Sequence, residues 1–250
     1  MGLAKQIVVK PISGKDANAL VKRLHYSKAV MASSQLHFGV FLRGNKRLLG
    51  AMQFGSSIDK RKTQKLVADT PWNGFLELNR MAFDELLPRN SESRAISIAL
   101  KLIKKNYPHI QWIISFADGA QCGDGTIYRA SGFYLTSIKV NKQMLLWKGK
   151  VIAKKTLDSG TYPRINGRYY SGYLLETKQA TPLPGFQLRY VYFLHPTAKE
   201  RLTVPILPFS KIKEVGASMY KGINIKERLK QDQVSTPDKI GGAAPTQTLQ

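Results

Sequence analysis

An aspartate near the middle of the chain is placed where it could do acid–base chemistry. Asp118 follows Trp112 to Phe116, a short apolar run of the kind that forms a buried strand. A carboxylate at the C-terminal end of such a strand lies where α/β proteins gather their ligands, and it could act as a general base or as a metal ligand. Aspartate is also frequent in turns such as Ala-Asp-Gly, so a purely structural role stays open.

A histidine and a tyrosine end the first predicted helix, which opens at Ser13. Histidine titrates near neutral pH, so His25 could relay protons or, with Asp118, ligate a metal ion. A histidine at a helix C-terminus also simply complements the helix dipole. The phenol of Tyr26 could donate a proton. We predict His25, Tyr26 and Asp118 as catalytic residues, and His25 and Asp118 as metal ligands.

A polar turn, Pro88 to Arg94, precedes a second predicted helix whose apolar residues recur with helical spacing. Ser91 and Ser93 are both predicted N-caps. The start of a helix offers free N–H groups to an anion, and two arginines of the turn would add positive charge. An ordinary capped helix would show the same pattern. The residues predicted to bind a cofactor here are Arg89, Asn90, Ser91, Ser93 and Arg94.

The strand predicted over Phe75 to Phe83 carries two polar residues among bulky apolar ones. Strict alternation would place Glu77 and Asn79 on the same face as Phe75, Met81 and Phe83. Buried polar groups need partners. Glu77 and Asn79 are therefore predicted either to bind substrate or to hydrogen-bond a neighbouring loop.

The elements that must position these side chains follow a recognisable order. The predicted segments are a strand at 6–11, a helix from 13, hairpin strands at 36–43 and 48–54, a strand at 75–83, a helix at 95–107, a strand at 112–116, a short helix at 126–131 and a strand from 132. This β-α-β-β-β-α-β-α-β order resembles that of the GNAT acyltransferases. The resemblance implies an α/β (α+β) fold with a central mixed sheet and flanking helices.

In the GNAT fold the central helix begins beside a splayed strand and receives the pyrophosphate of coenzyme A. The usual turn there is Gln/Arg-x-x-Gly-x-Gly/Ala, whereas the turn Pro88 to Ala95 has no glycine. Two explanations stay open. Either the donor is not coenzyme A, or serine hydroxyls and arginines hold its phosphates.

The charge of the chain points to a polyanionic partner. The 250 residues carry a formal net charge of +23, which favours nucleic acid or an anionic membrane surface. The apolar runs are too short for a membrane span, and we find no signal peptide. The single cysteine excludes an internal disulfide and a cysteine-cluster zinc site. We expect a cytoplasmic protein.

Basic residues gather in two regions. The predicted loop from Gly55 to Thr70 contains Lys60, Arg61, Lys62 and Lys65, and we predict that the first three bind substrate. From residue 139 to 230 there are 18 Lys and Arg against 5 Asp and Glu, with tyrosines and phenylalanines interleaved. Cations that meet phosphates and rings that stack on bases suit a nucleic-acid surface. A solvated basic face is the alternative.

We predict three parts of the chain. Residues 1–155 form the GNAT-like catalytic core. Residues 156–233 form a basic, aromatic-rich extension packed on that core, which contacts DNA. Residues 234–250, rich in Pro, Gly, Thr and Gln, form a disordered tail.

Several short strings, in order along residues 5–220, closely resemble the Mom family of phage proteins. They are His25-Tyr26-Ser27-Lys28, Leu36-His37-Phe38-Gly39-Val40-Phe41, Gln53-Phe54-Gly55, Leu76-Glu77-Leu78-Asn79-Arg80-Met81, Pro88-Arg89-Asn90-Ser91-Glu92-Ser93-Arg94-Ala95 and Ser115-Phe116-Ala117-Asp118.

The resemblance implies a phage-encoded, GNAT-like transferase that acts in the host cytoplasm on double-stranded DNA. It implies conversion of adenine N6 to a carbamoylmethyl form, which protects phage DNA from host restriction enzymes. The donor is unknown; an acyl-CoA-like donor and an iron requirement are both open. The functional candidates of the family fall at His25, Tyr26, Ser91 and Asp118. Because an amine within stacked duplex is out of reach, the adenine is expected to be flipped out, and Tyr26 could stack on it.

Two other functions fit the sequence. A conventional GNAT N-acetyltransferase would use acetyl-CoA, although the missing glycines of the turn at residues 88–95 count against it. A non-enzymatic protein that coats DNA would need only the positive charge.

Overall fold

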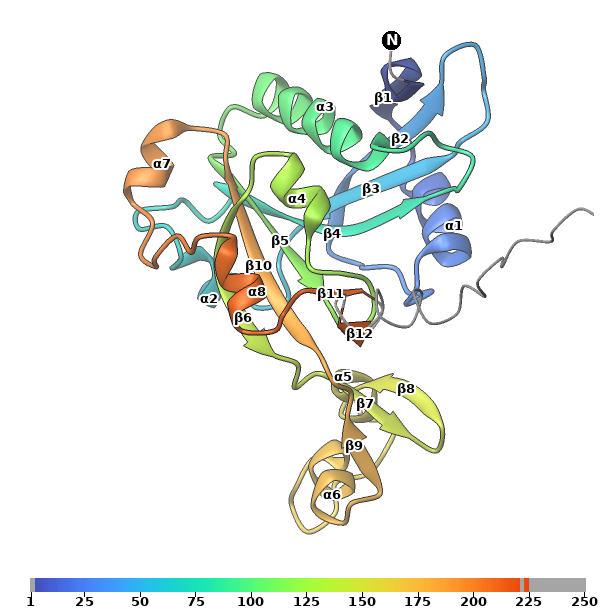
Figure 1. Cartoon of the computed structure of the whole chain (residues 1–250), viewed down its shortest axis with the longest axis vertical. Helices are drawn as coiled ribbons and strands as arrows, with labels where there is room; N and C mark the ends of the chain where they lie inside the picture. Colours follow the sequence, from blue (N-terminus) through green and yellow to red (C-terminus); the bar gives the residue numbers. More distant parts are fainter. Residues whose placement is uncertain (1–2, 221–222, 225–250) are drawn as a thin grey trace, which may run out of the picture.

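A computed structural model describes residues 3–220 and 223–224, and a seven-stranded sheet forms its centre (Figure 1). The described chain begins with a short 3₁₀ helix, η1 (Leu3–Gln6). Across the sheet, the strands lie in the spatial order β1 (Ile7–Pro11), β2 (Ser34–Leu42), β3 (Gly50–Gly55), β4 (Phe75–Phe83), β5 (Trp112–Asp118), β10 (Phe186–Phe193) and β6 (Tyr134–Val140). β4 and β5 are parallel, and all other neighbours in this sheet are antiparallel.

Helices cover both faces of this sheet. The apolar stripe of α3 (Ser91–Asn106) is buried in the main core together with Met52 of β3. Ala17 and Leu20 of α1 (Gly14–Leu24) pack on Ala51, the neighbour of Met52 in the same strand, so α1 lies on the opposite face. Short helices complete the larger part of the molecule: α2 (Lys60–Gln64), α4 (Thr126–Ala130), α7 (Pro196–Glu200) and α8 (Ser210–Glu214).

The predicted order of elements is confirmed. β1-α1-β2-β3-β4-α3-β5-α4-β6 is the β-α-β-β-β-α-β-α-β order of a GNAT-like α/β fold with a mixed sheet. The predicted start of α1 at Ser13 is also confirmed: Ser13 is its N-cap, and the Ser13 hydroxyl accepts a hydrogen bond from the Asp16 amide at 3.1 Å. The segment at 55–70, which we predicted to be a loop, contains the five-residue helix α2.

The predicted caps of α3 are wrong. Asn90 occupies the cap position in a left-handed conformation, with φ of 70°, and its side chain makes no capping bond. The Ser91 hydroxyl instead donates to the Pro88 carbonyl at 2.6 Å, and the Ser93 hydroxyl donates to the Asn90 carbonyl at 3.3 Å. Serine side chains satisfy nearby carbonyls readily, and here that local bonding replaces capping of the free N–H groups.

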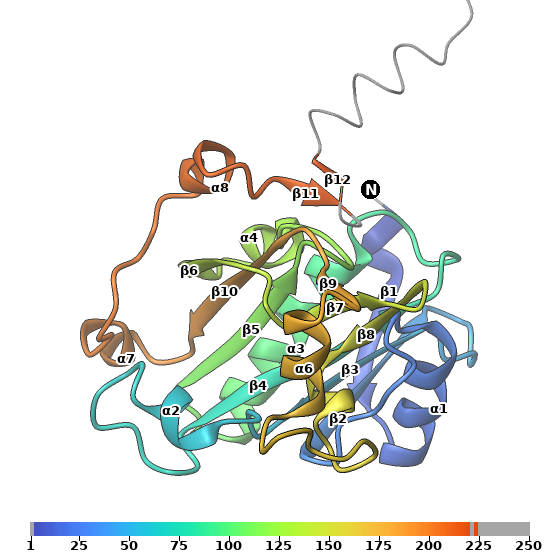
Figure 2. The same cartoon turned by 90° about the horizontal axis from the view of Figure 1, so that it is seen from below.

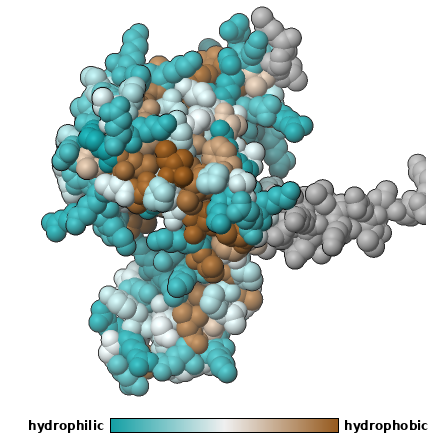
Figure 3. Space-filling view, turned by 60° about the vertical axis from the view of Figure 1, so that its left-hand side comes forward, coloured by the Kyte–Doolittle hydropathy of each residue, from teal (hydrophilic) through white to brown (hydrophobic). Residues whose placement is uncertain are grey.

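A small unit projects from the larger part (Figures 1 and 3). It contains β7 (Met144–Trp147), β8 (Lys150–Ala153), β9 (Ala180–Pro182), α5 (Lys154–Leu157) and α6 (Tyr170–Glu176). Its own apolar core is formed by Leu145, Leu157, Leu174 and Ala180. The chain then returns to the main sheet as β10, which lies between β5 and β6.

This arrangement differs from the predicted division at residue 155. β10 belongs to the main sheet, since it pairs along β5 on one side and β6 on the other. Several rings of the predicted extension also pack inside the protein: Tyr190 is fully buried, and Tyr162, Tyr170 and Tyr173 are partly buried against the core of the projecting unit. Tyr169 is an exception, with 52% of its surface exposed. The predicted tail at 234–250 lies outside the described residues.

The chain ends, as far as it is described, in a short hairpin of β11 (Met219–Tyr220) and β12 (Ile223–Asn224). Among the described residues, no helix combines the length and the apolar character that a membrane crossing requires.

Candidate active site

The main sheet opens between its two parallel strands (Figure 2). β4 and β5 are paired only from Phe75 to Glu77 on one side and from Trp112 to Ile114 on the other. Beyond this point β5 continues along β10, as far as the pair of Asp118 and Gln187. The second half of β4 and the end of β5 therefore border a gap in the sheet.

A β-bulge in β4 changes which side chains face this gap. Gln53 of β3 pairs with Arg80 and the next residue pairs with Leu78, so Asn79 is an extra residue. Leu76 and Leu78, and after the bulge Met81 and Phe83, contribute to the core under α3. The strict alternation that we predicted for this strand is therefore wrong beyond Asn79, and Met81 and Phe83 face the side opposite to Glu77.

The bulge residue is hydrogen-bonded to the start of β2 and to the loop that follows β3. Asn79 is 6% exposed; its Oδ1 accepts a hydrogen bond from the Ser34 hydroxyl at 3.1 Å, and its Nδ2 donates to the Ser56 carbonyl at 3.3 Å. Of the two roles left open for Asn79, these bonds match the structural one. The predicted contact of Asn79 with substrate stays a prediction.

Two carboxyl groups at the gap bind protons more tightly than usual. Burial raises the pKa of Glu77, although the nearby Ser57, Asn79 and Arg80 oppose the shift. Burial also raises the pKa of Asp118, against backbone hydrogen bonds from Ala120 and Gln121. The Ala120 amide donates to Asp118 Oδ1 at 3.0 Å. A carboxylate with a raised pKa is a better proton acceptor once it is ionised.

Tyr26 reaches this region from the end of α1. Burial raises the pKa of its phenol, and the neighbouring Cys122 and Asp118 raise it further, whereas Arg80 lowers it. The phenol thus keeps its proton at physiological pH. The ring is 47% exposed, so it is open to a ligand. The structure therefore brings together Tyr26 and Asp118, two of the three predicted catalytic residues.

His25 is buried behind Tyr26, with the two ring centroids 4.3 Å apart. Its Nδ1 lies 2.8 Å from the Ser27 hydroxyl and accepts a bond from the Ser27 amide at 3.2 Å. Burial, Arg80 and Lys28 lower the pKa of His25 to about 4. The imidazole is consequently neutral at pH 7 and a weak base, which suits a role in supporting Tyr26.

The described residues do not fit the predicted metal site. Within 3–220 and 223–224, no group of three or more His, Cys, Asp and Glu side chains could hold a metal ion. The charges that act on the His25 ring come from Arg80 and Lys28, and positive charge disfavours cation binding.

Arg80 is a site residue for which we predicted no role from the sequence. Its Nε donates to the Ala29 carbonyl at 2.9 Å, and its Nη1 donates to the Asn79 carbonyl at 2.7 Å. The guanidinium thus ties the segment that follows α1 to the bulge of β4. It also acts electrostatically on Tyr26 and Glu77. An arginine within an apolar strand was the signal that could have pointed to it.

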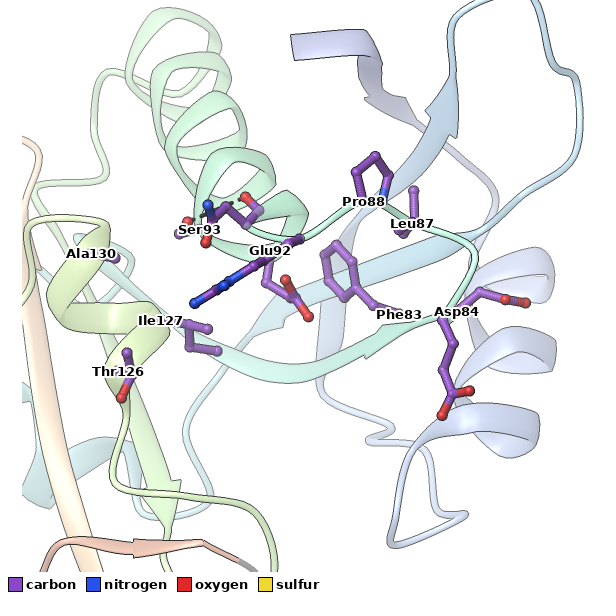
Figure 4. A pocket seen from close by; sticks show the side chains of 12 residues that line it. Phe83, Asp84, Leu87, Pro88, Glu92, Ser93, Thr126, Ile127 and Ala130 are labelled. Atoms are coloured by element: carbon purple, nitrogen blue, oxygen red, sulfur yellow. Dashed lines mark hydrogen bonds between the residues drawn. The ribbon is translucent and has the colours of Figure 1, made fainter. Parts of the chain in front are cut away.

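A pocket of about 320 Å³ lies between the starts of α3 and α4 (Figure 4). Glu92 and Ser93 of α3 face Thr126 and Ile127 of α4 across it. Of the five residues predicted to bind a cofactor, Arg89, Asn90 and Ser93 line this pocket. The other two do not; Ser91 is fully buried.

The pocket is not strongly positive. Its charged lining residues are Asp84, Glu85, Glu92 and Arg89. The Asp84 carboxylate is partly balanced by Arg23 and Arg47, whose nitrogens lie 3.8 and 3.6 Å from it. With Asp84 balanced in this way, Glu85 and Glu92 still outnumber Arg89 in the lining, which is an unfavourable setting for a pyrophosphate.

The basic residues predicted to bind substrate lie on α2, in the loop between β3 and β4. Arg61 and Lys62 are exposed. Lys60 Nζ sits 4.5 Å from the ring centre of Trp72 and 3.3 Å from Asn73 Oδ1. The loop begins at Ser56 and Ser57, which contact Asn79 and Glu77, so these cations flank the site rather than form it.

Known proteins resemble this chain in sequence and in fold. Methylcarbamoylase mom of Escherichia phage Mu is 34% identical over 211 residues, which cover 81% of this chain and 82% of that protein. A Bacillus subtilis acetyltransferase in complex with CoA is 12% identical, with a TM-score of 0.41 over 75% of this chain and 97% of that one. NAA60 of Arabidopsis thaliana with a bisubstrate analogue is 11% identical, with a TM-score of 0.43 over the same shares.

The family assignment rests on sequence. Residues 6–211 match the model of the Mom protein family. This range includes every element from β1 to α7 and all side chains of the site described above. The phage Mu relative exceeds 30% identity over most of both chains. The chain therefore belongs to the Mom protein family.

Proposed function

We propose that this protein transfers a carbamoylmethyl group to the N6 amine of adenine in DNA. The observation that carries the proposal is its 34% identity, over 211 residues, to the methylcarbamoylase of phage Mu. The opening between β4 and β5, where raised-pKa carboxyls meet an exposed tyrosine, supplies groups that suit transfer to an amine. In a phage the product would protect DNA from restriction in the host cytoplasm.

The reaction needs one proton acceptor at the attacking amine. A bond forms between adenine N6 and the donor methylene carbon, the leaving group takes the electron pair of the broken bond, and N6 loses a proton. We assign that proton to Asp118, because its carboxylate ends β5 beside Tyr26 and has a raised pKa. Tyr26, which stays protonated, is assigned to hold the adenine ring by stacking.

Glu77 and His25 would support this chemistry. The Glu77 carboxyl lies on the strand opposite Asp118 and could accept a hydrogen bond from the base. The buried, neutral His25 packs against Tyr26 and fixes the plane of its ring. Arg80 holds the segment that carries both aromatic residues.

The donor is assigned to the pocket at the start of α3, where Arg89, Asn90 and Ser93 line the wall. Ser91 and Arg94 would act indirectly, through the shape of the turn. The carboxylates of the pocket support a donor whose bound part is neutral or cationic, in contrast to the pyrophosphate of coenzyme A.

Duplex DNA is the proposed partner. The net charge of +23 supplies the long-range attraction. Lys60, Arg61 and Lys62 flank the opening of the site and are assigned to phosphates.

Mass spectrometry of nucleosides from cells that express the protein tests the proposal. We expect a deoxyadenosine with the mass increment of a carbamoylmethyl group. Unmodified DNA together with acetyl transfer from acetyl-CoA to a protein or a small amine would instead establish the acetyltransferase alternative. Unmodified DNA together with tight binding would establish a DNA-coating protein and contradict the proposal.

The α2 cations give a separate prediction. Replacing Lys60, Arg61, Lys62 and Lys65 with alanine should weaken duplex binding and reduce the slope of log K against log salt, by about 0.9 for each phosphate that is no longer neutralised. Binding is measured by fluorescence anisotropy between about 50 and 200 mM salt, a range over which such slopes are resolved. The control changes Lys101, Lys104 and Lys105 on α3. A slope unchanged from the wild-type value would remove α2 from the interface.

A further inference from the structure

The loop between β3 and β4 carries an apolar side chain that the proposed reaction does not use. Ile58 has 66% of its surface exposed, more than any other large apolar residue of the described chain. Trp72, near the other end of the loop, is 50% exposed. Leaving such side chains in water forgoes the stabilisation that burial would give. Single exposed apolar residues are common on protein surfaces, so it is the place of Ile58 beside the site, together with its exposure, that points to a role.

Ile58 stands at the margin of the candidate active site. The carbonyl of Ser56 accepts hydrogen bonds from the Ser33 hydroxyl at 3.0 Å and from Asn79 Nδ2 at 3.3 Å. Ser57 is buried near the Glu77 carboxyl and opposes the rise of its pKa. Ile58 is the next residue and is exposed, so it lies at the edge of the region that holds Glu77.

The loop that presents Ile58 is firmly anchored. Trp112 Nε1 donates to the Thr70 hydroxyl at 3.0 Å, and Gln64 Nε2 donates to the Thr70 carbonyl at 2.6 Å. Val67 is buried in an apolar cluster with Phe75 and Trp112, and the Ala68 amide donates a hydrogen bond to the Arg201 carbonyl at 2.9 Å. Together with the hydrogen bonds of Ser56, these contacts fix both ends of the loop that carries Ile58.

Positive charge predominates in the loop that carries the exposed apolar residues, although Asp59 and Asp69 lie in the same loop. Arg61, Lys62 and Lys65 are exposed, and none of the ion pairs formed within residues 3–220 involves them. Lys60 lies over the ring of Trp72. An apolar tip between cations matches the chemistry of a DNA duplex, whose phosphates flank a stack of apolar base faces.

We propose that Ile58 is a wedge that enters the duplex at the target adenine and fills the space left when that base swings into the opening between β4 and β5. This inference rests on the proposed function. A paired adenine presents its N6 amine inside the stack, so it must leave the helix before it can react. Proteins that unstack base steps commonly do so with a single inserted aliphatic or aromatic side chain.

Ile58 suits this task better than Trp72. The Trp72 ring is partly covered by the Lys60 ammonium, which would keep it at the phosphate backbone. The branched side chain of Ile58 has no such partner among the contacts of the described residues and is stiff at χ1. A stiff, apolar tip loses little conformational entropy on insertion.

Permanganate footprinting tests the wedge without knowledge of the donor. The reagent oxidises unstacked thymines, including the partner of a flipped adenine, on a DNA fragment bound by the full chain. We expect reactive thymines with the wild-type protein and about tenfold less reactivity with Ile58→Ser, because the unstacking penalty is no longer offset. Ile58→Leu should retain the wild-type pattern, and duplex affinity should change by about twofold or less, because the phosphate contacts remain.

Val8→Ser is the matched control, since Val8 is a 40% exposed residue on β1, the far edge strand of the sheet. Wild-type reactivity in Ile58→Ser, or no reactive thymine with the wild-type protein, would overturn the wedge. Nucleoside analysis decides the proposed function separately: unmodified adenine would reject the transferase, whereas the thymine pattern would still report on Ile58.

Discussion

Replacing Asp118 with asparagine is expected to lower adenine modification by about 100- to 10,000-fold, the usual contribution of a general base. Asparagine keeps the carbonyl oxygen that accepts the Ala120 amide, so the turn after β5 should survive. What it removes is the ability to take a proton from the N6 amine. The measurement is the fraction of modified deoxyadenosine in DNA from cells that express equal amounts of each protein.

The pH dependence of adenine modification by the wild-type protein and by Asp118→Asn distinguishes a general base from a structural residue. Because burial raises the pKa of Asp118, its ionised form is present above that raised pKa and is lost as the pH falls through it. Modification of added plasmid DNA in a cell extract, which supplies the donor, should therefore decline on the acid side with an apparent pKa above the ordinary aspartate value. The residual activity of Asp118→Asn should lack this acid limb.

Thermal melting supplies a further check on Asp118. A carboxyl whose pKa is raised in the folded state binds its proton more tightly there than in the unfolded state. Ionisation at neutral pH therefore opposes folding, and stability falls as the pH rises through the window between the two pKa values. Asp118→Asn should leave the melting temperature unchanged or higher at pH 7.

Asp69→Asn serves as the control for these experiments, because Asp69 is exposed and adopts a positive φ of 53° that asparagine tolerates. If Asp118→Asn modifies the same fraction of deoxyadenosine as the control, Asp118 is only a turn residue. Glu77 would then be the next candidate for the general base.

Local patterns in the sequence predicted the helices and strands but not the β-bulge that interrupts β4. The β4 boundaries, Phe75 and Phe83, follow directly from the apolar run, and the cap at Ser13 follows from its spacing to Asp16. The bulge at Asn79 depends on how β3 pairs with β4, a non-local property that a two-residue period cannot show. This one extra residue decides that Arg80, rather than Met81, accompanies Glu77.

Long-range pairing also explains the altered division of the chain. The basic, aromatic composition after residue 139 suggested one extension, yet β10 completes the main sheet between β5 and β6. Only the polypeptide between β6 and β10 projects, and its tyrosines are needed for a small core of its own. A basic, aromatic-rich composition favours DNA binding, but it does not distinguish an aromatic side chain that is buried from one that is exposed to solvent.

Arg80→Lys is expected to lower modification by about 10- to 100-fold, because small displacements of positioned groups have effects of this size. The guanidinium donates from Nε to the Ala29 carbonyl and from Nη1 to the Asn79 carbonyl. A lysine ammonium is a single point donor and cannot span both carbonyls in that geometry. The segment that carries His25 and Tyr26 should then lose its fixed position over the gap. The modified fraction of deoxyadenosine is again the measurement.

An NMR titration of the histidines distinguishes this positioning role from a general loss of structure. Arg80 is one of the charges that lower the pKa of His25 to about 4, so Arg80→Met should raise that pKa toward the ordinary value. The chain has four histidines, few enough to assign. Arg43→Lys, a change in the hairpin turn after β2, is the control and should leave both readouts unaltered. If Arg80→Lys modifies DNA at the wild-type level and Arg80→Met leaves the His25 titration in place, then Arg80 does not organise the site, and the loop contacts of Asn79 must position Tyr26 instead.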